Sequence, residues 1–246
     1  MARFQDKVVV VTGGSDGIGL ATAKAFAAEG AHVYVTGRRQ DRLDEAVSEI
    51  GGKTVGVQGD VGKIADLDRL YERIARDHDR VDVVFANAGI SETVPFGEVD
   101  EAHFDRVFGA NVKGLLFSVQ KALPLMKAGG SVILNGSGVG SKGFAGLSVY
   151  SATKAAIRSF ARTWTSDLKS RGIRVNVVSP GMIDTPAMQK FLRDNDGMED
   201  ALKQMTPLGR IGDAADIARA VLFLASSEAS FIAGIELFVD GGVVAV

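Results

Sequence analysis

The chain of 246 residues is 46% hydrophobic and carries a formal net charge of −2, from 28 lysines and arginines against 30 aspartates and glutamates. This balance lacks the basic excess that nucleic acids and anionic membrane surfaces attract. The absence of cysteine excludes disulfides and thiolate metal sites.

The hydrophobic pattern contains no membrane segment. No apolar run approaches the roughly 18 residues of a membrane span. The first residues, "MARFQDKVVVVTGG", enter a strand pattern without the apolar region of a signal peptide. We therefore expect a cytoplasmic protein that works without a membrane, a nucleic acid or a bound metal.

Seven short runs rich in β-branched residues alternate with helical patterns along the chain. Most runs are almost continuously apolar, which is typical of parallel strands buried on both faces. The expected strands are 7–13, 31–37, 53–60, 81–89, 130–137, 173–181 and 235–242. The expected helices are 17–29, 41–50, 63–77, 101–127, 150–170 and 213–226. The pattern predicts a single α/β domain over residues 1–246, a Rossmann-like doubly wound sheet of seven mostly parallel strands with helices on both faces.

Residues 182–212 are the only long stretch without an expected strand or a secure helix. A connection of that length in a compact domain is usually a lid or a binding loop. In doubly wound sheets, ligands bind beyond the carboxyl ends of the strands. We therefore expect a substrate lid at 182–212, and binding residues directly after each strand.

The first strand is followed by "TGGSDGIG", in which Gly13, Gly17 and Gly19 have G-x-x-x-G-x-G spacing. Glycine permits positive φ and removes the Cβ that would keep a pyrophosphate away from backbone N–H groups. The N-terminus of the helix that follows adds partial positive charge. The turn is expected to bind a dinucleotide through Gly13, Ser15, Asp16, Gly17, Ile18 and Gly19.

The second strand ends at Gly37, where many dinucleotide-binding folds have an acid for the ribose 2′-hydroxyl. Arg38 and Arg39 follow, and a guanidinium binds a 2′-phosphate with charge-assisted hydrogen bonds. Asp16 weighs slightly the other way, because its negative charge could lie near the adenosine. The arginines predict that NADP(H) is preferred over NAD(H), although two arginines after a strand can also be ordinary solvated charges.

Two further strand ends carry candidate cofactor contacts. Asp60 and Val61 follow the third strand and can meet an adenine with an acceptor and an apolar face. "NAG", Asn87, Ala88 and Gly89, follows the fourth strand and allows the backbone to approach a cofactor closely. Each alone is as typical of a turn, but successive strand ends line one crevice.

"YSATK" places Tyr150 and Lys154 one helical turn apart at the start of a helix. An amphipathic tyrosine at the core edge beside a solvated lysine is the structural alternative. The chemical interpretation is that the cation stabilises the phenolate, so that the tyrosine can pass a proton near neutral pH. Bringing the pKa of a phenol from about 10 towards 7 needs roughly 4 kcal/mol, most of which one nearby charge supplies.

With the glycine turn, "NAG", "YSATK" and "PGMIDTP" in order, the chain resembles the short-chain dehydrogenase/reductase family over its whole length. The resemblance implies a catalytic tetrad of Asn111, Ser137, Tyr150 and Lys154. It also implies a water relay at Asn111 and hydrogen bonds from Lys154 to the nicotinamide ribose. "PGMIDTP" would hold the nicotinamide carboxamide through the Ile183 backbone and Thr185, and Pro180 and Gly181 would be further cofactor contacts.

Finer similarity in "LFSVQKALPLM" and "AGIELFVDGG" resembles the broad-range NADPH-dependent alcohol dehydrogenases of bacteria. This implies hydride transfer between NADP(H) and a secondary alcohol or ketone, and a homotetramer. Tyr150 would supply the proton, and Ser137 a second hydrogen bond to the oxygen. The expected substrate contacts are mostly apolar and indicate a roomy hydrophobic pocket. They are Ser137, Val139, Phe144, Leu147, Tyr150, Met182 and Met188, with Ser91, Glu92, Val94, Phe191 and Leu192 as further residues on that side.

Two alternatives remain. A 3-oxoacyl-[acyl-carrier-protein] reductase shares these motifs and would need a basic patch for its acidic carrier. Arg171 could belong to such a patch, but the nearby turn "MKAGG" carries only Lys127. A nucleotide-sensing binding protein could retain the fold without catalysis, but such a protein would be expected to have lost Tyr150 or Lys154. His32, His78 and His103 lack metal-ligand spacing, and we expect them to be unclustered and structural or exposed.

Overall fold

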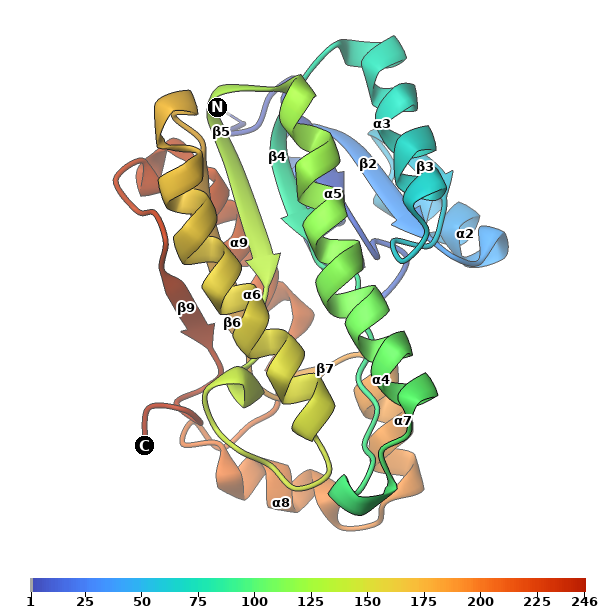
Figure 1. The fold of residues 1–246 in the computed structure, drawn as a ribbon, viewed down its shortest axis with the longest axis vertical. Helices are drawn as coiled ribbons and strands as arrows, with labels where there is room; N and C mark the ends of the chain where they lie inside the picture. Colours follow the sequence, from blue (N-terminus) through green and yellow to red (C-terminus); the bar gives the residue numbers. More distant parts are fainter. Residues whose placement is uncertain (1) are drawn as a thin grey trace.

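The computed structural model describes residues 2–246 and contains one seven-stranded sheet, in the order β3-β2-β1-β4-β5-β6-β9 (Figure 1). Every strand pair in it is parallel. The strands are β1 (Val8–Val11), β2 (His32–Gly37), β3 (Lys53–Gln58), β4 (Val81–Ala86), β5 (Met126–Asn135), β6 (Arg174–Pro180) and β9 (Glu236–Val239). The predicted sheet of seven strands is confirmed, and it is parallel throughout.

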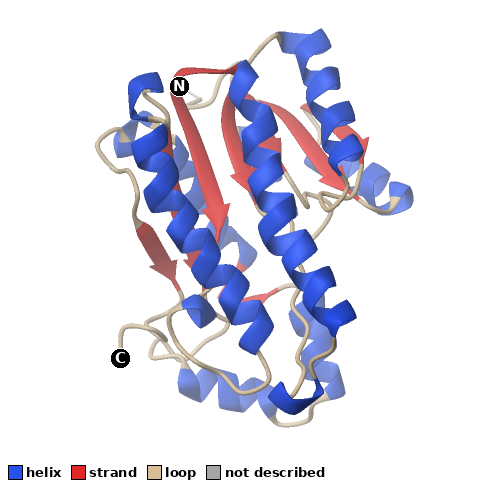
Figure 2. Ribbon diagram, viewed as in Figure 1, coloured by secondary structure: helices blue, strands red, loops and turns tan. Residues whose placement is uncertain are grey.

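Helices cover both faces of the sheet (Figure 2). One face packs against α3 (Ile64–His78), α5 (Leu115–Ala122) and α6 (Ser148–Asp167), and the other packs against α1 (Gly17–Ala28), α2 (Gln40–Ile50) and α9 (Ala214–Ala225). In β1, Val8 and Val10 belong to the first core and Val9 and Val11 to the second. All four are fully buried, which is why this strand is continuously apolar.

The chain order of the strands reverses beside β1. The connections from β1 lead outward through β2 to β3, whereas those from β4 lead the other way through β5 and β6 to β9. A crevice opens at such a switch point, at the carboxyl ends of the strands. The glycine turn after β1 and "NAG" after β4 therefore lie side by side.

The stretch predicted as one helix at 101–127 is divided. It consists of α4 (Glu101–Phe108), a π-helical turn at Gly109–Gly114, α5, and a 3-10 turn at Leu123–Leu125. Pro124 lies in this last turn, and a proline cannot donate to an α-helical ladder. Strand β5 then starts at Met126, opposite Val81, four residues earlier than predicted.

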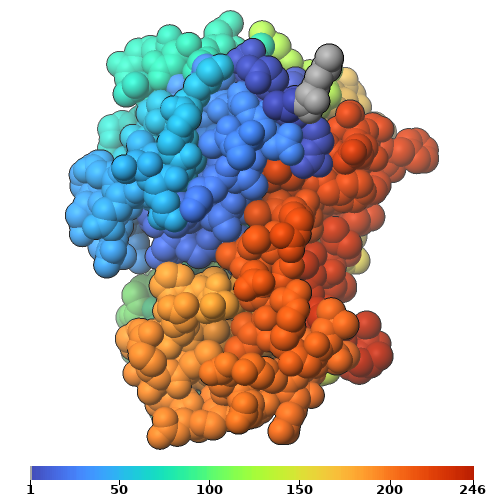
Figure 3. Space-filling view, turned by 180° about the vertical axis from the view of Figure 1, so that it is seen from behind, coloured from blue at the N-terminus to red at the C-terminus, as the bar shows by residue number. Residues whose placement is uncertain are grey.

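The segment 182–212, which is predicted to be a lid and is called the lid below, is more regular than predicted. It contains α7 (Pro186–Asp194) and α8 (Met198–Met205), and β7 (Ile183–Asp184) at its start pairs with β8 (Gly212–Asp213) at its end. Helix α7 begins where the Thr185 hydroxyl accepts from the N–H of Met188 and proline occupies the first turn. Figure 3 shows the lid in orange at one end of the molecule, beyond the blue N-terminal part.

Within residues 2–246, no helix combines the length and the apolar character needed to cross a membrane.

Candidate active site

The glycines of the turn after β1 have two different structural roles. Gly13 and Gly17 have φ values of +65° and +52°, which favour glycine. Gly19 instead allows close packing, because a Cβ there would lie 2.0 Å from the carbonyl oxygen of Gly13. The side chain of Asp16 is exposed and does not cap α1, so the helix N-terminus is open to a bound anion. This arrangement fits a pyrophosphate.

Thr12, which the sequence analysis overlooked, joins the glycine turn to "NAG". Its Oγ1 accepts hydrogen bonds from the N–H groups of Asn87 and Ala88, both at 3.0 Å. The Asn87 amide in turn donates to the carbonyl oxygens of Thr12 and Gly13 at 3.0 and 3.1 Å. Asn87 thus holds the turn in place, while the exposed Gly89 beyond it leaves the backbone accessible. A threonine directly before the first glycine was the available signal.

The end of β2 presents two guanidinium groups that have no carboxylate partner among residues 2–246. Gly37 is buried against Ser15, and a Cβ on it would lie 2.9 Å from the Ser15 hydroxyl oxygen. Arg38 and Arg39 follow it and are exposed, and neither forms an ion pair within residues 2–246. The charge at this edge is therefore available for an anionic group.

The segment after β3 is held by hydrogen bonds from its backbone N–H groups to two carboxylates. Asp66 Oδ2 accepts from the N–H of Asp60 at 2.8 Å, and Asp60 Oδ1 accepts from the N–H of Gly62 at 2.9 Å. This contact with Asp60 is the main reason why the pKa of Asp66 lies below its ordinary value. Val61 is buried against the π-helical turn, where a Cβ on Gly114 would lie 2.8 Å from it.

Tyr150 and Lys154 share one face of α6, as predicted, and Ser137 lies at the end of β5 beside them. The Lys154 Nζ atom lies 5.5 Å from the centre of the Tyr150 ring. It also donates to the carbonyl oxygen of Asn135 at 2.8 Å. Asn135 was missed by the sequence analysis. Its amide donates to Asn87 Oδ1 at 2.9 Å, so it connects the lysine to the glycine turn.

The electrostatics of this pair differ from the expectation. Burial lowers the pKa of Lys154 to about 8. Burial also raises the pKa of Tyr150, and a hydrogen bond with Ser137 opposes that increase. The expectation that Lys154 brings the tyrosine towards neutrality is therefore wrong for the protein alone, because both groups lose hydration in the same interior.

Asn111 lies in the π-helical turn between α4 and α5 and is buried. Its side chain accepts from the N–H of Ile90 at 2.8 Å and donates to the carbonyl oxygen of Ile90 at 2.9 Å. It also donates to the hydroxyl of Thr153, on α6, at 3.1 Å. A π-turn inside a helix is often found at functional sites. Here the π-turn directs the Asn111 amide to the loop after β4, so that Asn111 holds this loop in position. A water relay at Asn111 stays a prediction.

"PGMIDTP" connects the sheet to the lid. Gly181 follows Pro180 and packs so closely against the C-terminal segment that a Cβ on it would lie 2.6 Å from the Cα of Asp240. Ile183 is buried in β7. Thr185 lies against the glycine turn, since a Cβ on Gly17 would be 3.2 Å from its methyl carbon. The segment therefore adjoins the glycine turn at 12–19, which we also call the cofactor cradle, as a nicotinamide contact requires.

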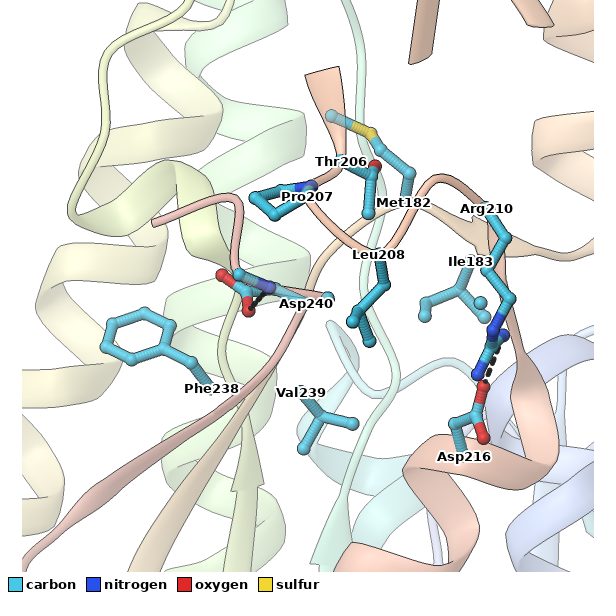
Figure 4. Close-up of a pocket in the computed structure, with 13 residues that line it drawn as sticks. Met182, Ile183, Thr206, Pro207, Leu208, Arg210, Asp216, Phe238, Val239 and Asp240 are labelled. Atoms are coloured by element: carbon cyan, nitrogen blue, oxygen red, sulfur yellow. Dashed lines mark hydrogen bonds and ion pairs between the residues drawn. The ribbon is translucent and has the colours of Figure 1, made fainter. Parts of the chain in front are cut away.

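The expected substrate residues come from three segments that converge on the carboxyl edge, but the cavity described below does not bring them together. A cavity of about 530 Å³ lies at the base of the lid (Figure 4). Of the expected substrate residues only Met182 lines it, and Tyr150 does not. Glu92 is turned towards His103 and Arg106 on α4, so its assignment to the substrate side is not supported. The roomy hydrophobic pocket stays a prediction.

Two of the three histidines are neighbours, contrary to expectation. The rings of His32 and His78 lie 4.3 Å apart, at the edge of the sheet opposite the glycine turn. His103 is buried, with 4% of its surface exposed. Over the described residues, 2–246, no group of three or more histidines, cysteines or carboxylates is placed to hold a metal ion.

Comparison with known proteins gives consistent matches over nearly the whole chain. The model of the family described as Enoyl-(Acyl carrier protein) reductase matches residues 13–244. The chain is 46% identical over 242 residues to "Oxidoreductase asL5" of Sarocladium schorii, covering 98% of this chain and 96% of that protein. It is 38% identical to the cyclopentanol dehydrogenase of Comamonas testosteroni, covering 98% of each. It is 36% identical to the 3-oxoacyl-[acyl-carrier-protein] reductase FabG of Thermotoga maritima, covering 98% and 99%.

Among solved structures, a short-chain dehydrogenase/reductase from Brucella melitensis described as glucose/ribitol dehydrogenase superposes with a TM-score of 0.93. The two chains are 30% identical, and 98% of each is covered. The sheet, its glycine turn and these matches define an oxidoreductase that binds a nicotinamide cofactor in a Rossmann-like fold. The chain belongs to the short-chain dehydrogenase/reductase family.

Proposed function

We propose that the protein transfers a hydride between NADP(H) and a hydrophobic secondary alcohol or ketone. The observation that carries the proposal is the Tyr150 phenol, which lies beside the buried cation of Lys154 at the carboxyl edge of the sheet, next to Ser137. The similarity to a cyclopentanol dehydrogenase supports this reaction class.

The proposed tetrad acts on the oxygen at which the reaction develops charge. When bound, the nicotinamide cofactor supplies or accepts the hydride at the substrate carbon. Tyr150 donates its proton to the carbonyl oxygen, and the Ser137 hydroxyl holds that oxygen by a second hydrogen bond. Lys154 stabilises the phenolate that is left.

The preference for NADP(H) rests on the end of β2. Arg38 and Arg39 are exposed there, without ion-pair partners in residues 2–246, and Gly37 stands where an acid would repel a 2′-phosphate. The backbone of the adjoining glycine turn would hold the pyrophosphate, with Asp16 directed to solvent.

The substrate class rests on the lid, which would close over the hydride-transfer site. Phe191, Met205 and Leu208 of the lid are 40%, 45% and 71% exposed, so the segment has apolar side chains that a ligand can contact. Methionines adapt to varied shapes, which suits bulky ketones. Asn111 would serve the reaction by fixing the loop after β4.

We expect the protein to work in the cytoplasm as a homotetramer. Among the described residues, β9 pairs with β6 alone, and Phe223 on α9 and Phe231 and Ile235 ahead of β9 are 37%, 103% and 38% exposed. Apolar side chains beside an open strand edge are typical of a subunit contact.

A 3-oxoacyl-[acyl-carrier-protein] reductase is the second candidate, and the similarity to FabG favours it. Its expected basic patch is not supported. Arg171 donates to the carbonyl oxygens of Leu123 and Met126, at 2.6 and 2.8 Å. Both Arg171 and Lys127 lie where β5 and β6 begin, so they are at the edge of the sheet opposite the proposed site.

The proposal is tested by comparing Tyr150→Phe with the wild-type protein. The variant lacks the proton donor but retains the cofactor cradle, so we expect turnover of an aryl ketone to fall at least about a hundredfold. Binding of NADPH, measured by calorimetry, should stay within about twofold. Turnover above about a tenth of the wild-type rate would remove Tyr150 from the mechanism. Faster reduction of a carrier-linked 3-oxoacyl substrate than of the free ketone would select the second candidate.

A further inference from the structure

A carboxylate close to the proposed substrate site points away from it and is held by the next helix. Glu92 lies in the connection between β4 and α4. Its Oε2 atom is 3.0 Å from Nδ1 of His103 and accepts from Arg106 at 3.0 Å. Arg106, and then His103, lower the pKa of the Glu92 carboxyl, so the group is ionised at neutral pH. We call these three residues the Glu92 clamp.

The clamp is built on a rigid part of α4. The N–H of His103 donates to Oδ1 of Asp100 at 2.7 Å, which caps the helix in its first turn. The His103 side chain is only 6% exposed, whereas that of Arg106 is 56% exposed. His103 therefore provides the fixed partner, and Arg106 adds a contact that solvent weakens.

The loop that carries Glu92 is tied at both ends to segments with proposed catalytic residues. At one end, Ile90 makes two hydrogen bonds with the side chain of Asn111. At the other end, the N–H of Val94 donates to the carbonyl oxygen of Gly146 at 2.9 Å. Gly146 has a φ of +78°, and a Cβ there would lie 2.7 Å from the methyl carbon of Thr93. It stands four residues before Tyr150, just ahead of α6.

From this geometry we infer that Glu92 is a positioning residue for the ketone. The clamp holds the middle of the loop 90–94 against α4, and the loop then braces the segment that leads into Tyr150. Because the glycine turn is held by its own contacts with Thr12 and Asn87, loss of the clamp should leave the cofactor site unchanged. The kinetic consequence of this inference rests on the proposed function. The structural consequence, that the clamp holds the loop 90–94 in place, does not.

The kinetic test uses Glu92→Ala in the full-length protein. We expect kcat/KM for the aryl ketone to fall about ten- to a hundredfold, since small displacements of a positioned substrate have effects of that size. Binding of NADPH should be unchanged. Both contacts of the clamp use the single atom Oε2, and Glu92→Gln keeps one side-chain oxygen that can accept from His103 and Arg106, so it should recover most of the loss. Lys24→Ala, which breaks the exposed Lys24–Glu49 pair between α1 and α2, is the matched control and should have no effect.

The structural test does not depend on turnover. Hydrogen exchange at the Val94 amide, which reports its bond to Gly146, should become at least about tenfold faster in Glu92→Ala. Exchange in β1 should not change, and this shows that the variant is folded. If Glu92→Ala does not fold, His103→Asn in the same measurement decides. Unchanged exchange at Val94, or an unchanged kcat/KM in an active enzyme, would overturn the inference. A wild-type protein that reduces no ketone would contradict the proposed function alone, and the exchange at Val94 would still decide whether the clamp exists.

Discussion

The glycine turn at 12–19 and the lid at 182–212 meet at the same edge of the sheet but are held in opposite ways. In the turn, backbone packs on backbone, and a single added methyl group on Gly19 would collide with Gly13. In the lid, α7 has no buried residue and α8 has only Leu202. The lid is fastened mainly at its base, where the N–H of Gly212 donates to Met182 and that of Leu208 to Gly241.

From this difference we expect one half of the site to be specific and the other to be adaptable. A pyrophosphate is the same in every dinucleotide, so a rigid cradle of fixed N–H groups suits it. A lid with few buried contacts opens at low cost, which allows substrates of different shape to enter. The following predictions test how far this division holds.

The largest effect is expected in the cradle. Gly19→Ala should destabilise the protein by about 3 kcal/mol, because overpacking against backbone cannot be relieved by a side-chain movement. It should also weaken NADPH binding. Gly143→Ala is the control, since a Cβ at Gly143 meets nothing within 4 Å. Urea unfolding of both variants provides the measurement, and equal stabilities would contradict the close packing described for the turn.

The next effect concerns the buried lysine of the rigid half. The pKa of Lys154 is lowered to about 8 in the folded protein, against 10.5 for an ordinary lysine. Between these values the unfolded chain binds more protons, so the free energy of unfolding should rise with pH. Relative to Lys154→Met, the wild-type protein should gain roughly 2–3 kcal/mol between pH 7 and pH 10. Denaturant unfolding of both proteins at the two pH values tests this. If the difference in unfolding free energy between them is the same at pH 7 and pH 10, folding does not lower the pKa of Lys154.

At the edge of the cradle, Arg38→Ala should weaken the use of NADPH but not that of NADH. Loss of a charge-assisted hydrogen bond costs about 1.5–3 kcal/mol, so KM for NADPH should rise about ten- to a hundredfold. KM for NADH should hardly change. Arg76→Ala, an exposed arginine on α3, serves as the control. Equal losses with both cofactors would exclude Arg38 from phosphate recognition.

The smallest effect is expected in the lid. Phe191 is 40% exposed, so Phe191→Ala should change the stability by no more than about 0.5 kcal/mol. If the ring covers the bound ketone, KM for a hydrophobic ketone should rise about three- to tenfold. Steady-state kinetics and thermal unfolding measure the two quantities. A large loss of stability would mean that the lid is as rigid as the cradle.

The sequence was most informative where neighbouring residues determine the structure. The seven strands and the turn from Gly13 to Gly19 could be predicted because buried parallel strands and positive-φ glycines leave local patterns. Helix α7 also had a local signal, Thr185 before Pro186, which was not used.

Contacts between distant segments could not be predicted in the same way. Asn135 reaches Asn87 and Lys154 only after β4, β5 and α6 are packed together. The turn of Glu92 towards His103 likewise depends on where α4 lies. The early start of β5 depends on Met126 pairing with Val81 across the sheet. The electrostatic expectation for Tyr150 failed for the same reason, since spacing reveals a nearby charge but not the burial of both groups.

The central claim, NADP(H)-dependent reduction of a hydrophobic ketone, is tested most directly by initial rates of an aryl ketone with NADPH and with NADH. The nicotinamide absorbance reports both reactions in the same assay. The structure predicts fast oxidation of NADPH and at least about tenfold slower oxidation of NADH. A preference for NADH would contradict the role of Arg38 and Arg39, and bound cofactor without turnover of any ketone would contradict the proposed reaction.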